Sequence, residues 1–316
     1  MPNVQYVNQL NVKSDVDYGQ EFERYLLSLI TEKSVTNNIS NTQLINTKSS
    51  VNNLRNFSEE AAQYHLSCGG KRIRAKIANK AGTALGLTKQ NSMAIAAIAE
   101  LLHNGSLVHD DLQDGDEVRR GNEAVWFKYG KDIAICTGDL LISAAYSALA
   151  DITNTKIIPH MISVIHTQTA AAIKGQSYDV HNKIQAITNL HDYEQVVIAK
   201  SGALLSLPIQ LALIASKNAY CLDKAQHIAN AFALIYQITD DLNDIHNDQV
   251  SNQKPSVLNI IFVLQNAGFT HNALSHAKQI ALQKASECIR LSQELPHHSG
   301  AYLGELASAL KSKLLN

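Results

Sequence analysis

The feature that most constrains the fold is a succession of long apolar segments with helical spacing. From about residue 54 onward the chain is rich in Ala, Leu, Ile, Gln and Lys, which favour helix over strand. The segments KIANKAGTALG, MAIAAIAELLHNGSLVHD and AQHIANAFALIYQITDD are too long and too rich in Ala for strands. Several are apolar on nearly all sides, which is typical of central helices in a large bundle. No strand-like alternation bounded by turns is visible. The sequence therefore predicts an all-α protein.

The predicted helices follow one another with little interruption. We expect them near 21–33, 54–66, 72–86, 90–114, 131–150, 156–182, 190–216, 221–246, 256–266, 272–292 and 299–315. Residues 1–50 are polar with one short helix, and an Asn-, Ser- and Thr-rich linker follows that helix. No change of composition divides the remainder. We therefore predict a polar N-terminal segment (1–50) and a single-domain bundle of roughly ten or more helices (51–316).

Bulk properties exclude several classes of protein. A net charge of −1 does not favour nucleic-acid binding, which usually requires a basic surface. The N-terminus lacks the basic and apolar regions of a signal peptide, and no uncharged apolar run approaches the roughly 20 residues that span a bilayer. The four cysteines are scattered without a CxxC pair, as in a reducing compartment. We expect a cytoplasmic protein without a membrane span.

Two acidic motifs follow long apolar helical runs. DDLQD contains Asp110, Asp111 and Asp114, and DDLND contains Asp240, Asp241 and Asp244. On a helix, residues four apart lie on one face, where two carboxylates repel by about 1 kcal/mol in water and by more at lower dielectric. Oxygen ligands without Cys indicate Mg²⁺. Either motif alone also fits a solvated helix end, but the repetition favours a cation site.

A basic cluster lies at the predicted start of the helix near 72–86. SCGGKRIRAKI offers two glycines followed by Lys71, Arg72, Arg74 and Lys76. Backbone donors at a helix N-terminus and nearby cations suit an oxyanion such as pyrophosphate. Arg119 and Arg120 supply further cations after the first acidic motif. Acids for Mg²⁺ and bases for phosphate together indicate a diphosphate substrate.

The motifs occur in the order and spacing of a known family. Over residues 60–265 the chain resembles the trans-isoprenyl diphosphate synthases (polyprenyl synthetases), and the resemblance rests on GGKRIR, ELLHNGSLVHDDLQD with RRG, GDLL, KGQSYDV, KSGALL and QITDDLND. It implies the isoprenoid synthase fold, in which helices surround a deep central cavity with the Asp-rich motifs at its mouth. It also implies a homodimer and a prenyltransferase that joins isopentenyl diphosphate to an allylic diphosphate to give an all-trans product.

The resemblance assigns roles to individual positions. It implies that Mg²⁺, about three ions per site, is held by the acidic motifs, with Asp110, Asp114, Asp240 and Lys200 as catalytic residues and Asp111, Asp241 and Asp244 as further metal residues. The positions that match the isopentenyl diphosphate site are Lys71, Arg74, His103 and Arg120. Those that match the allylic site are Arg119, Lys200 and Gln237. Ser201 stands where the family has Thr, and Lys254 matches a further diphosphate lysine.

Two small residues bear on product length. In the family, the residues one turn before the first Asp point down the cavity, where an aromatic side chain ends elongation early. Here these positions are Gly105 and Ser106. We therefore predict a product of C20 or longer.

Three other interpretations remain open. A class I terpene cyclase shares the fold, but its second metal motif normally carries Asn, Ser and Glu, and it has no use for GGKRIR. A catalytically silent subunit of a heteromeric synthase would tend to lose an acidic motif. His103, His109 and Asp110 also resemble a His-Asp metal phosphohydrolase, which leaves GGKRIR and DDLND unexplained.

Overall fold

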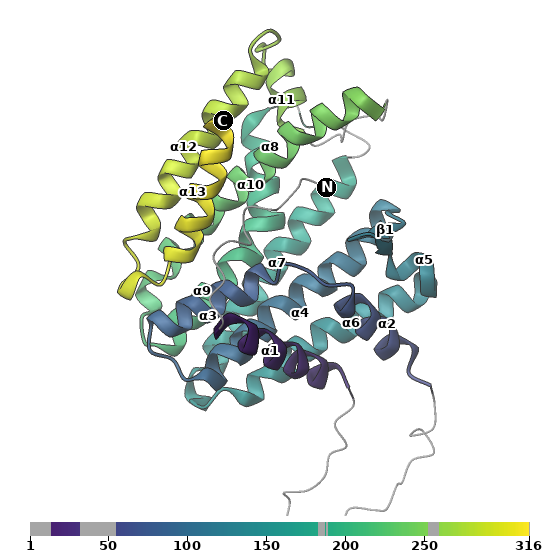
Figure 1. The fold of residues 1–316 in the computed structure, drawn as a ribbon, viewed down its shortest axis with the longest axis vertical. Helices are drawn as coiled ribbons and strands as arrows, with labels where there is room; N and C mark the ends of the chain where they lie inside the picture. Colours follow the sequence, from purple (N-terminus) through teal and green to yellow (C-terminus); the bar gives the residue numbers. More distant parts are fainter. Residues whose placement is uncertain (1–13, 32–54, 183–186, 188, 252–258, 316) are drawn as a thin grey trace, which may run out of the picture.

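The computed structural model describes residues 14–31, 55–182, 187, 189–251 and 259–315. Lys254 and the start of the predicted helix 256–266 lie outside these residues. The described chain is helical almost throughout (Figure 1), which confirms the predicted all-α class. The α-helices are α1 (Ser14–Ile30), α2 (Phe57–Ser67), α3 (Ile73–Ala84), α4 (Lys89–Asp114), α5 (Val125–Tyr129), α6 (Lys131–Ser147), α7 (Ile158–Asn182), α8 (Leu190–Val197), α9 (Ala203–Ala215), α10 (Leu222–Ser251), α11 (Ile260–Asn266), α12 (Ala273–Ser292) and α13 (Ala301–Leu315).

Short elements connect these helices. Four 3-10 turns are η3 (Ala148–Asp151), η4 (Thr155–Ile157), η6 (Ala219–Cys221) and η7 (Pro296–His298), and η5 (Ile198–Gly202) is a π-helical segment between α8 and α9. A hairpin of β1 (Val118–Arg119) and β2 (Asn122–Glu123) follows α4, and its turn residues Arg120 and Gly121 have φ of 55° and 79°. The sequence prediction missed this hairpin because strands of two residues are too short to show a period.

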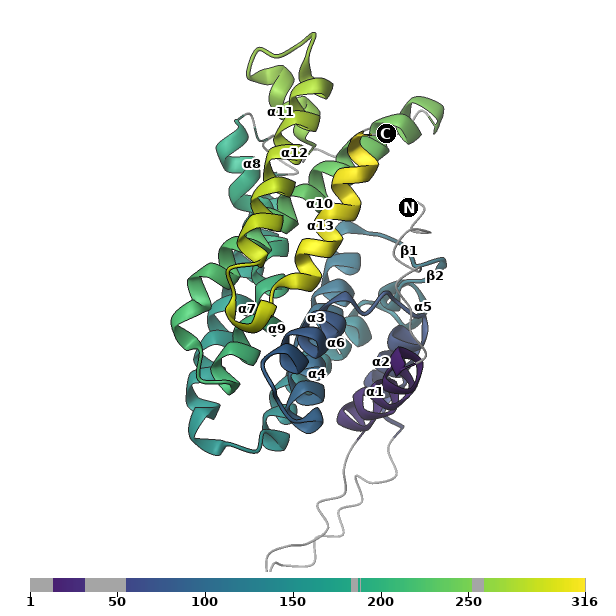
Figure 2. The same cartoon turned by 60° about the vertical axis from the view of Figure 1, so that its left-hand side comes forward.

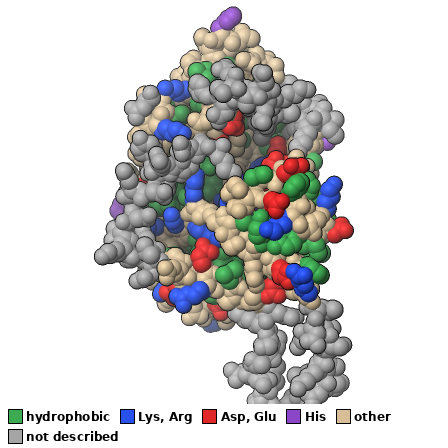
Figure 3. Space-filling view, turned by 45° about the vertical axis from the view of Figure 1, so that its right-hand side comes forward, with side chains coloured by type: hydrophobic (Ala, Val, Ile, Leu, Met, Phe, Trp, Pro, Cys, Tyr) green, Lys and Arg blue, Asp and Glu red, His purple; other side chains and the backbone are tan. Residues whose placement is uncertain are grey.

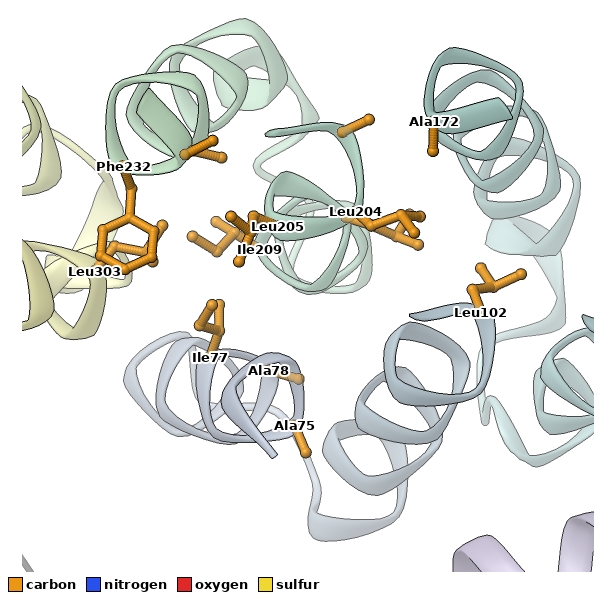
Figure 4. Close-up of a cluster of buried hydrophobic side chains, with 14 of the residues drawn as sticks. Ala75, Ile77, Ala78, Leu102, Ala172, Leu204, Leu205, Ile209, Phe232 and Leu303 are labelled. Atoms are coloured by element: carbon orange, nitrogen blue, oxygen red, sulfur yellow. The ribbon is translucent and has the colours of Figure 1, made fainter. Parts of the chain in front are cut away.

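Helix α9 lies in the middle of the bundle. Its residues from Ala203 to Ile214 are all buried, as the nearly uniform apolar sequence predicts. Figure 4 shows Leu204 between Ala172 of α7 and Leu102 of α4, while side chains on its other side point toward α3 and α10. The core is therefore shared by helices from every part of the described chain.

Helix α1 belongs to the same core. It begins at Ser14, earlier than predicted, and it packs near α2, α4 and α6 (Figure 2). Phe22, Leu26 and Ile30 are 2%, 0% and 2% exposed. Because these side chains join the main apolar cluster, α1 is held to the bundle although a polar segment separates it from α2.

Two helical segments are long and apolar enough to cross a bilayer by length and composition alone, Lys131–Asp151 and Leu190–Ala215. Both contain charged residues, so neither is an uncharged apolar run. The second segment is a core helix, with 78% of its apolar window buried, whereas 44% of the window in the first is buried. Length and composition alone do not make a span, and the absence of one stays a prediction.

Candidate active site

The first acidic motif occupies the last turns of α4. The helix ends directly after it, where Gly115 adopts φ of 73°. Acids at a helix C-terminus face the negative end of the helix dipole, so this placement is unfavourable without a cation. Burial, together with the neighbouring Asp114, raises the pKa of Asp110 to about 6, although the Lys200 ammonium opposes the shift. The negative charge of Asp110 is therefore only partly compensated by the protein.

Asp111 is turned away from solvent and holds an arginine. It is fully buried, and its Oδ1 accepts a hydrogen bond of 2.7 Å from Arg119 Nε and a second one from the same guanidinium. Its Oδ2 is buried without a hydrogen-bond partner. Asp111 thus fixes Arg119, a predicted allylic-site residue, beside the motif.

The second acidic motif lies within α10. Burial and the nearby Asp244 raise the pKa of Asp240 to about 6, while the ammonium groups of Lys71 and Lys313 oppose this shift. Lys71 of the basic cluster and Asp240 therefore lie close enough to interact. Lys313 comes from α13, in the C-terminal part of the chain where the sequence offered no signal.

Asp241 is the buried counterpart of Asp111. Its carboxylate accepts hydrogen bonds from Tyr193 Oη (2.7 Å), Gln237 Nε2 (2.8 Å) and the backbone N–H of Ile260 (2.9 Å). One side chain thus ties α10 to α8 and α11. It also orients Gln237, which the resemblance places at the allylic substrate.

The described carboxylates form no closed metal cage. No group of three or more His, Cys, Asp or Glu side chains converges on one point among the described residues. Mg²⁺ usually keeps waters and takes one or two carboxylates plus substrate phosphates. Raised pKa values at Asp110 and Asp240, with oxygen as the only ligand type, suit such an open site.

Lys200 is presented by the π-helical segment η5. A π turn is commonly found at functional sites, and here it is held against α7, where a Cβ on Gly175 would clash with the backbone of Ala199 and Lys200. Lys200 Nζ lies 2.6 Å from Asp179 Oδ2. Burial lowers the pKa of Lys200, but the nearby carboxylates outweigh burial and the pKa is raised overall. The largest of these effects comes from Asp179, and smaller ones come from Asp110 and Asp114. The ammonium is therefore held charged beside the first motif.

Asp179 is a site residue that the sequence analysis missed. It belongs to KGQSYDV, a motif used for the resemblance without a role for its acid. Its place in a motif of the resemblance could have indicated it, but its pairing with Lys200 depends on how α7 packs against η5. Ser201 follows Lys200 in η5 and is partly exposed.

The predicted isopentenyl diphosphate residues make up a second basic cluster, which comes from four parts of the chain. Lys71 precedes α3, Arg74 is in its first turn, His103 is on α4 and Arg120 is in the hairpin turn. Arg120 donates to the carbonyl of Gly69, and a Cβ on Gly70 would lie 2.9 Å from its guanidinium carbon. Glycine is therefore needed at residue 70 for this approach.

Burial and mutual repulsion shape the charges of this cluster. Burial lowers the pKa of Arg74 to about 10 and, with the repulsion of Arg74 and Arg120, lowers that of His103 far below its usual value. His103 is therefore neutral and can donate a hydrogen bond. Among the described residues on the face in Figure 3, basic side chains lie beside acidic and neutral ones.

The two predicted chain-length residues point in different directions. A Cβ on Gly105 would lie 3.1 Å from Ile142 and 3.2 Å from the carbonyl of Gly138, so this residue faces α6. Ser106 is partly exposed, and its hydroxyl donates to His103 O at 2.8 Å. Of the two, Ser106 is the position with room for a larger side chain.

The fold and the paired acidic and basic clusters define an all-α protein whose charged residues could hold metal ions and diphosphate. The sequence profile of the polyprenyl synthetases matches residues 55–261, so the chain belongs to the polyprenyl synthetase family. This confirms the predicted family, and the structural neighbours confirm the isoprenoid synthase fold.

Named relatives agree with this assignment. The chain is 28% identical to a short chain isoprenyl diphosphate synthase of Methanothermobacter thermautotrophicus over 62% of its own length and 60% of the relative's. It is 28% identical to a geranylgeranyl diphosphate synthase of Saccharolobus solfataricus over 78% of its own length and 79% of the relative's. A geranylgeranyl pyrophosphate synthetase structure from Geoglobus acetivorans superposes with a TM-score of 0.75 at 21% identity, covering 94% of this chain and 96% of that one.

Proposed function

We propose that the protein is a Mg²⁺-dependent prenyltransferase that condenses isopentenyl diphosphate with an allylic diphosphate. The observation that carries the proposal is that each acidic motif lies beside its own cations, Lys200 at the first and Lys71 at the second. Such an arrangement suits two diphosphates in one site. The names of the relatives, which include geranylgeranyl and farnesyl diphosphate synthases, support the same substrate class.

The residues divide into three groups under this proposal. Isopentenyl diphosphate is held by Lys71, Arg74, His103 and Arg120. The allylic diphosphate is held by Arg119, Lys200 and Gln237. Magnesium is held by Asp110, Asp114, Asp240 and Asp244, whereas Asp111 and Asp241 position Arg119 and Gln237.

The chemistry follows from charge. Bound Mg²⁺ would neutralise the charge that develops on the leaving pyrophosphate. Lys200 and Arg119 hold that diphosphate, so the allylic C–O bond breaks and leaves a carbocation. The neutral His103 donates to the second diphosphate while the double bond of isopentenyl diphosphate attacks the cation. A C–C bond forms, the departing pyrophosphate takes a proton from the adduct, and the chain is five carbons longer. Apolar side chains from the surrounding helices exclude water from the cation.

A basic cluster with four contributing elements favours a synthase over a cyclase or a phosphohydrolase, which have no second diphosphate to bind. Both acidic motifs are intact, which favours a catalytic chain over a silent subunit.

The test is a condensation assay with isopentenyl diphosphate, Mg²⁺ and C5, C10 or C15 primers. We expect product from the wild type, and a loss of at least about 100-fold in kcat for Asp110→Asn and Asp240→Asn, because each removes a negative ligand from the metal site. Asp223→Asn, at an exposed position of the same helix as Asp240, should stay active. Pyrophosphate release without isopentenyl diphosphate and without condensation would instead favour a cyclase or hydrolase.

Product length is proposed to be C20 or longer because Ser106 is small and partly exposed. Ser106→Phe should shorten the product by at least one C5 step, as judged by chromatography of the dephosphorylated alcohols. Ser106→Ala is the matched control and should leave the product unchanged. A wild type that stops at farnesyl diphosphate, or a Phe variant with the wild-type product, would contradict the proposed geometry.

We also infer that two copies pair through α6. This helix is apolar, but Ile135 is 47% exposed and Cys136 is also exposed on it. Less than half of the apolar stretch within Lys131–Asp151, the segment that includes α6, is buried within one chain. A second copy is the occupant that the family resemblance favours.

A further inference from the structure

One arginine of GGKRIR has no substrate role in the proposed function. Arg72 lies between Lys71 and Arg74 in the sequence, but its guanidinium is bound by groups of other elements. Its Nε and Nη2 donate to Glu23 of α1 at 2.7 and 2.9 Å, and Nη2 also donates to Leu66 O at 2.9 Å. Its Nη1 lies 3.9 Å from the Glu100 carboxylate of α4. The side chain of Arg72 is 11% exposed, and that of Glu100 is 3% exposed.

The backbone of Arg72 is also unusual. Its φ of 48° is in the left-handed region, which costs free energy for a residue other than glycine. Two glycines precede Lys71, so the segment before α3 has little conformational preference of its own. Contacts from other elements must therefore hold the backbone that presents Lys71.

Glu100 is the inner end of this arrangement. Its Oε1 accepts the backbone N–H of Ala75 at 3.1 Å, in the first turn of α3. Its negative charge also stabilises the charged forms of Arg74 and Arg120. One buried carboxylate thus contacts or faces the arginines on which the proposed diphosphate site depends.

From these contacts we propose that Glu23, Arg72 and Glu100 form a clamp that positions the isopentenyl diphosphate site. The inference rests on the proposed function. Arg72 fixes the segment between Lys71 and Arg74 by bridging α1 and α4, and none of the three clamp residues touches substrate. Glu23 comes from α1, outside the residues 55–261 that match the family profile. The N-terminal helix therefore acts on affinity for one substrate at a distance.

A clamp that positions substrate-binding residues should change substrate affinity in a way that an ion pair which only stabilises the fold would not. A positioning role for Lys71 and Arg74 affects the KM of isopentenyl diphosphate, while the allylic substrate is held by other residues. A structural role would lower the melting temperature and the amount of active protein without separating the two KM values. Glu23 is the best position to test because its side chain is 42% exposed, so its replacement leaves the core intact.

The experiment compares full-length wild type, Glu23→Gln, Arg72→Gln, the double variant and Glu23→Asp in steady-state assays with Mg²⁺. We expect Glu23→Gln to raise the KM of isopentenyl diphosphate by roughly threefold to tenfold, with the KM of the primer and kcat within about twofold. The double variant should be no worse than Arg72→Gln alone, because both changes break one clamp. Glu23→Asp should recover part of the affinity.

The matched control is Glu60→Gln, which breaks the exposed ion pair with Arg55 on α2 and should keep both wild-type KM values. If the wild type is active and Glu23→Gln has the wild-type KM for both substrates, the clamp is overturned but the proposed function is not. A parallel rise of both KM values in Glu23→Gln would have the same consequence. A wild type that forms no condensation product would overturn the proposed function and the clamp with it.

Discussion

At the residue scale, the acids of each Asp-rich motif do different work. Asp111 and Asp241 are buried and accept hydrogen bonds from Arg119 and Gln237, whereas Asp110 and Asp240 lie near the ammonium groups of Lys200 and Lys71. A buried carboxylate requires hydrogen-bond donors, and in both motifs a nearby residue of the proposed allylic site supplies one of them. The second Asp of each motif thereby orients a group of the proposed allylic site.

A buried histidine gives the protein a pH dependence of stability. His65 of α2 is 3% exposed and shares a hydrogen bond of 3.1 Å with Asn104. Burial, aided by the nearby Arg120, lowers the pKa of His65 to about 3. In the unfolded chain the imidazole of His65 takes up a proton below about pH 6.5, whereas in the folded protein it stays neutral down to about pH 3. The contribution of His65 to stability is therefore fully present above about pH 6.5 and is lost as the pH falls toward 3.

We therefore expect the contribution of His65 to the free energy of unfolding to fall by about 2 kcal/mol between pH 7.5 and pH 5. Urea unfolding at both pH values checks this. His65→Gln should remove that part of the difference, whereas His191→Gln, at an exposed position of α8, should not. Parallel pH dependences for wild type and His65→Gln would contradict the assignment.

At the scale of elements, the site depends on where helices end or change period. Gly115 ends α4 directly after Asp114, the hairpin turn places Arg120 over the Gly69 carbonyl, and η5 presents Lys200. Each of these interruptions lies next to a residue of the proposed site. The prediction of a continuous helix over 190–216 was right in extent and missed this π turn.

The packing of α7 against η5 can be tested at Gly175. A Cβ there would lie 2.9 Å from the carbonyl carbon of Ala199 and closer to the Lys200 nitrogen. Gly175→Ala should therefore lower the free energy of unfolding by about 1–3 kcal/mol and reduce kcat by displacing Lys200. Gly19→Ala in α1 is the matched control, because nothing lies within 4 Å of the added Cβ. It should stabilise the helix by up to about 1 kcal/mol. Equal melting temperatures for the wild type and Gly175→Ala would refute the close packing.

At the scale of the whole molecule, the core and the surface lead to different conclusions. Helix α9 is buried along nearly its whole length, and one face of α1 joins the bundle through Phe22, Leu26 and Ile30. The segment that contains α6 is similar in apolar character to the segment that contains α9, but 44% of its apolar stretch is buried, against 78% in the other. Within one chain no described element covers Ile135 fully, which is why we infer a second copy there.

The dimer is tested by light scattering. The wild type should have about twice the chain mass of 34.6 kDa, and Ile135→Glu should shift it toward the monomer because a carboxylate would be buried without a partner. Leu274→Glu, at a 51% exposed position of α12, should leave the mass unchanged. A monomeric wild type would exclude the proposed pairing.

The sequence by itself determined the helices and the chemistry of the motifs. Helical periodicity is local, so α4, α7 and α12 fell within a few residues of their predicted bounds, and the four-residue spacing of Asp110 and Asp114 needs no distant partner. Only the tertiary structure decided which acids are buried and what they hold. Tyr193 and Asp241 are 48 residues apart, and Glu23 and Arg72 are 49 residues apart. Such partners meet through the packing of helices, which no local pattern encodes, because burial and hydrogen bonding are set by the whole fold.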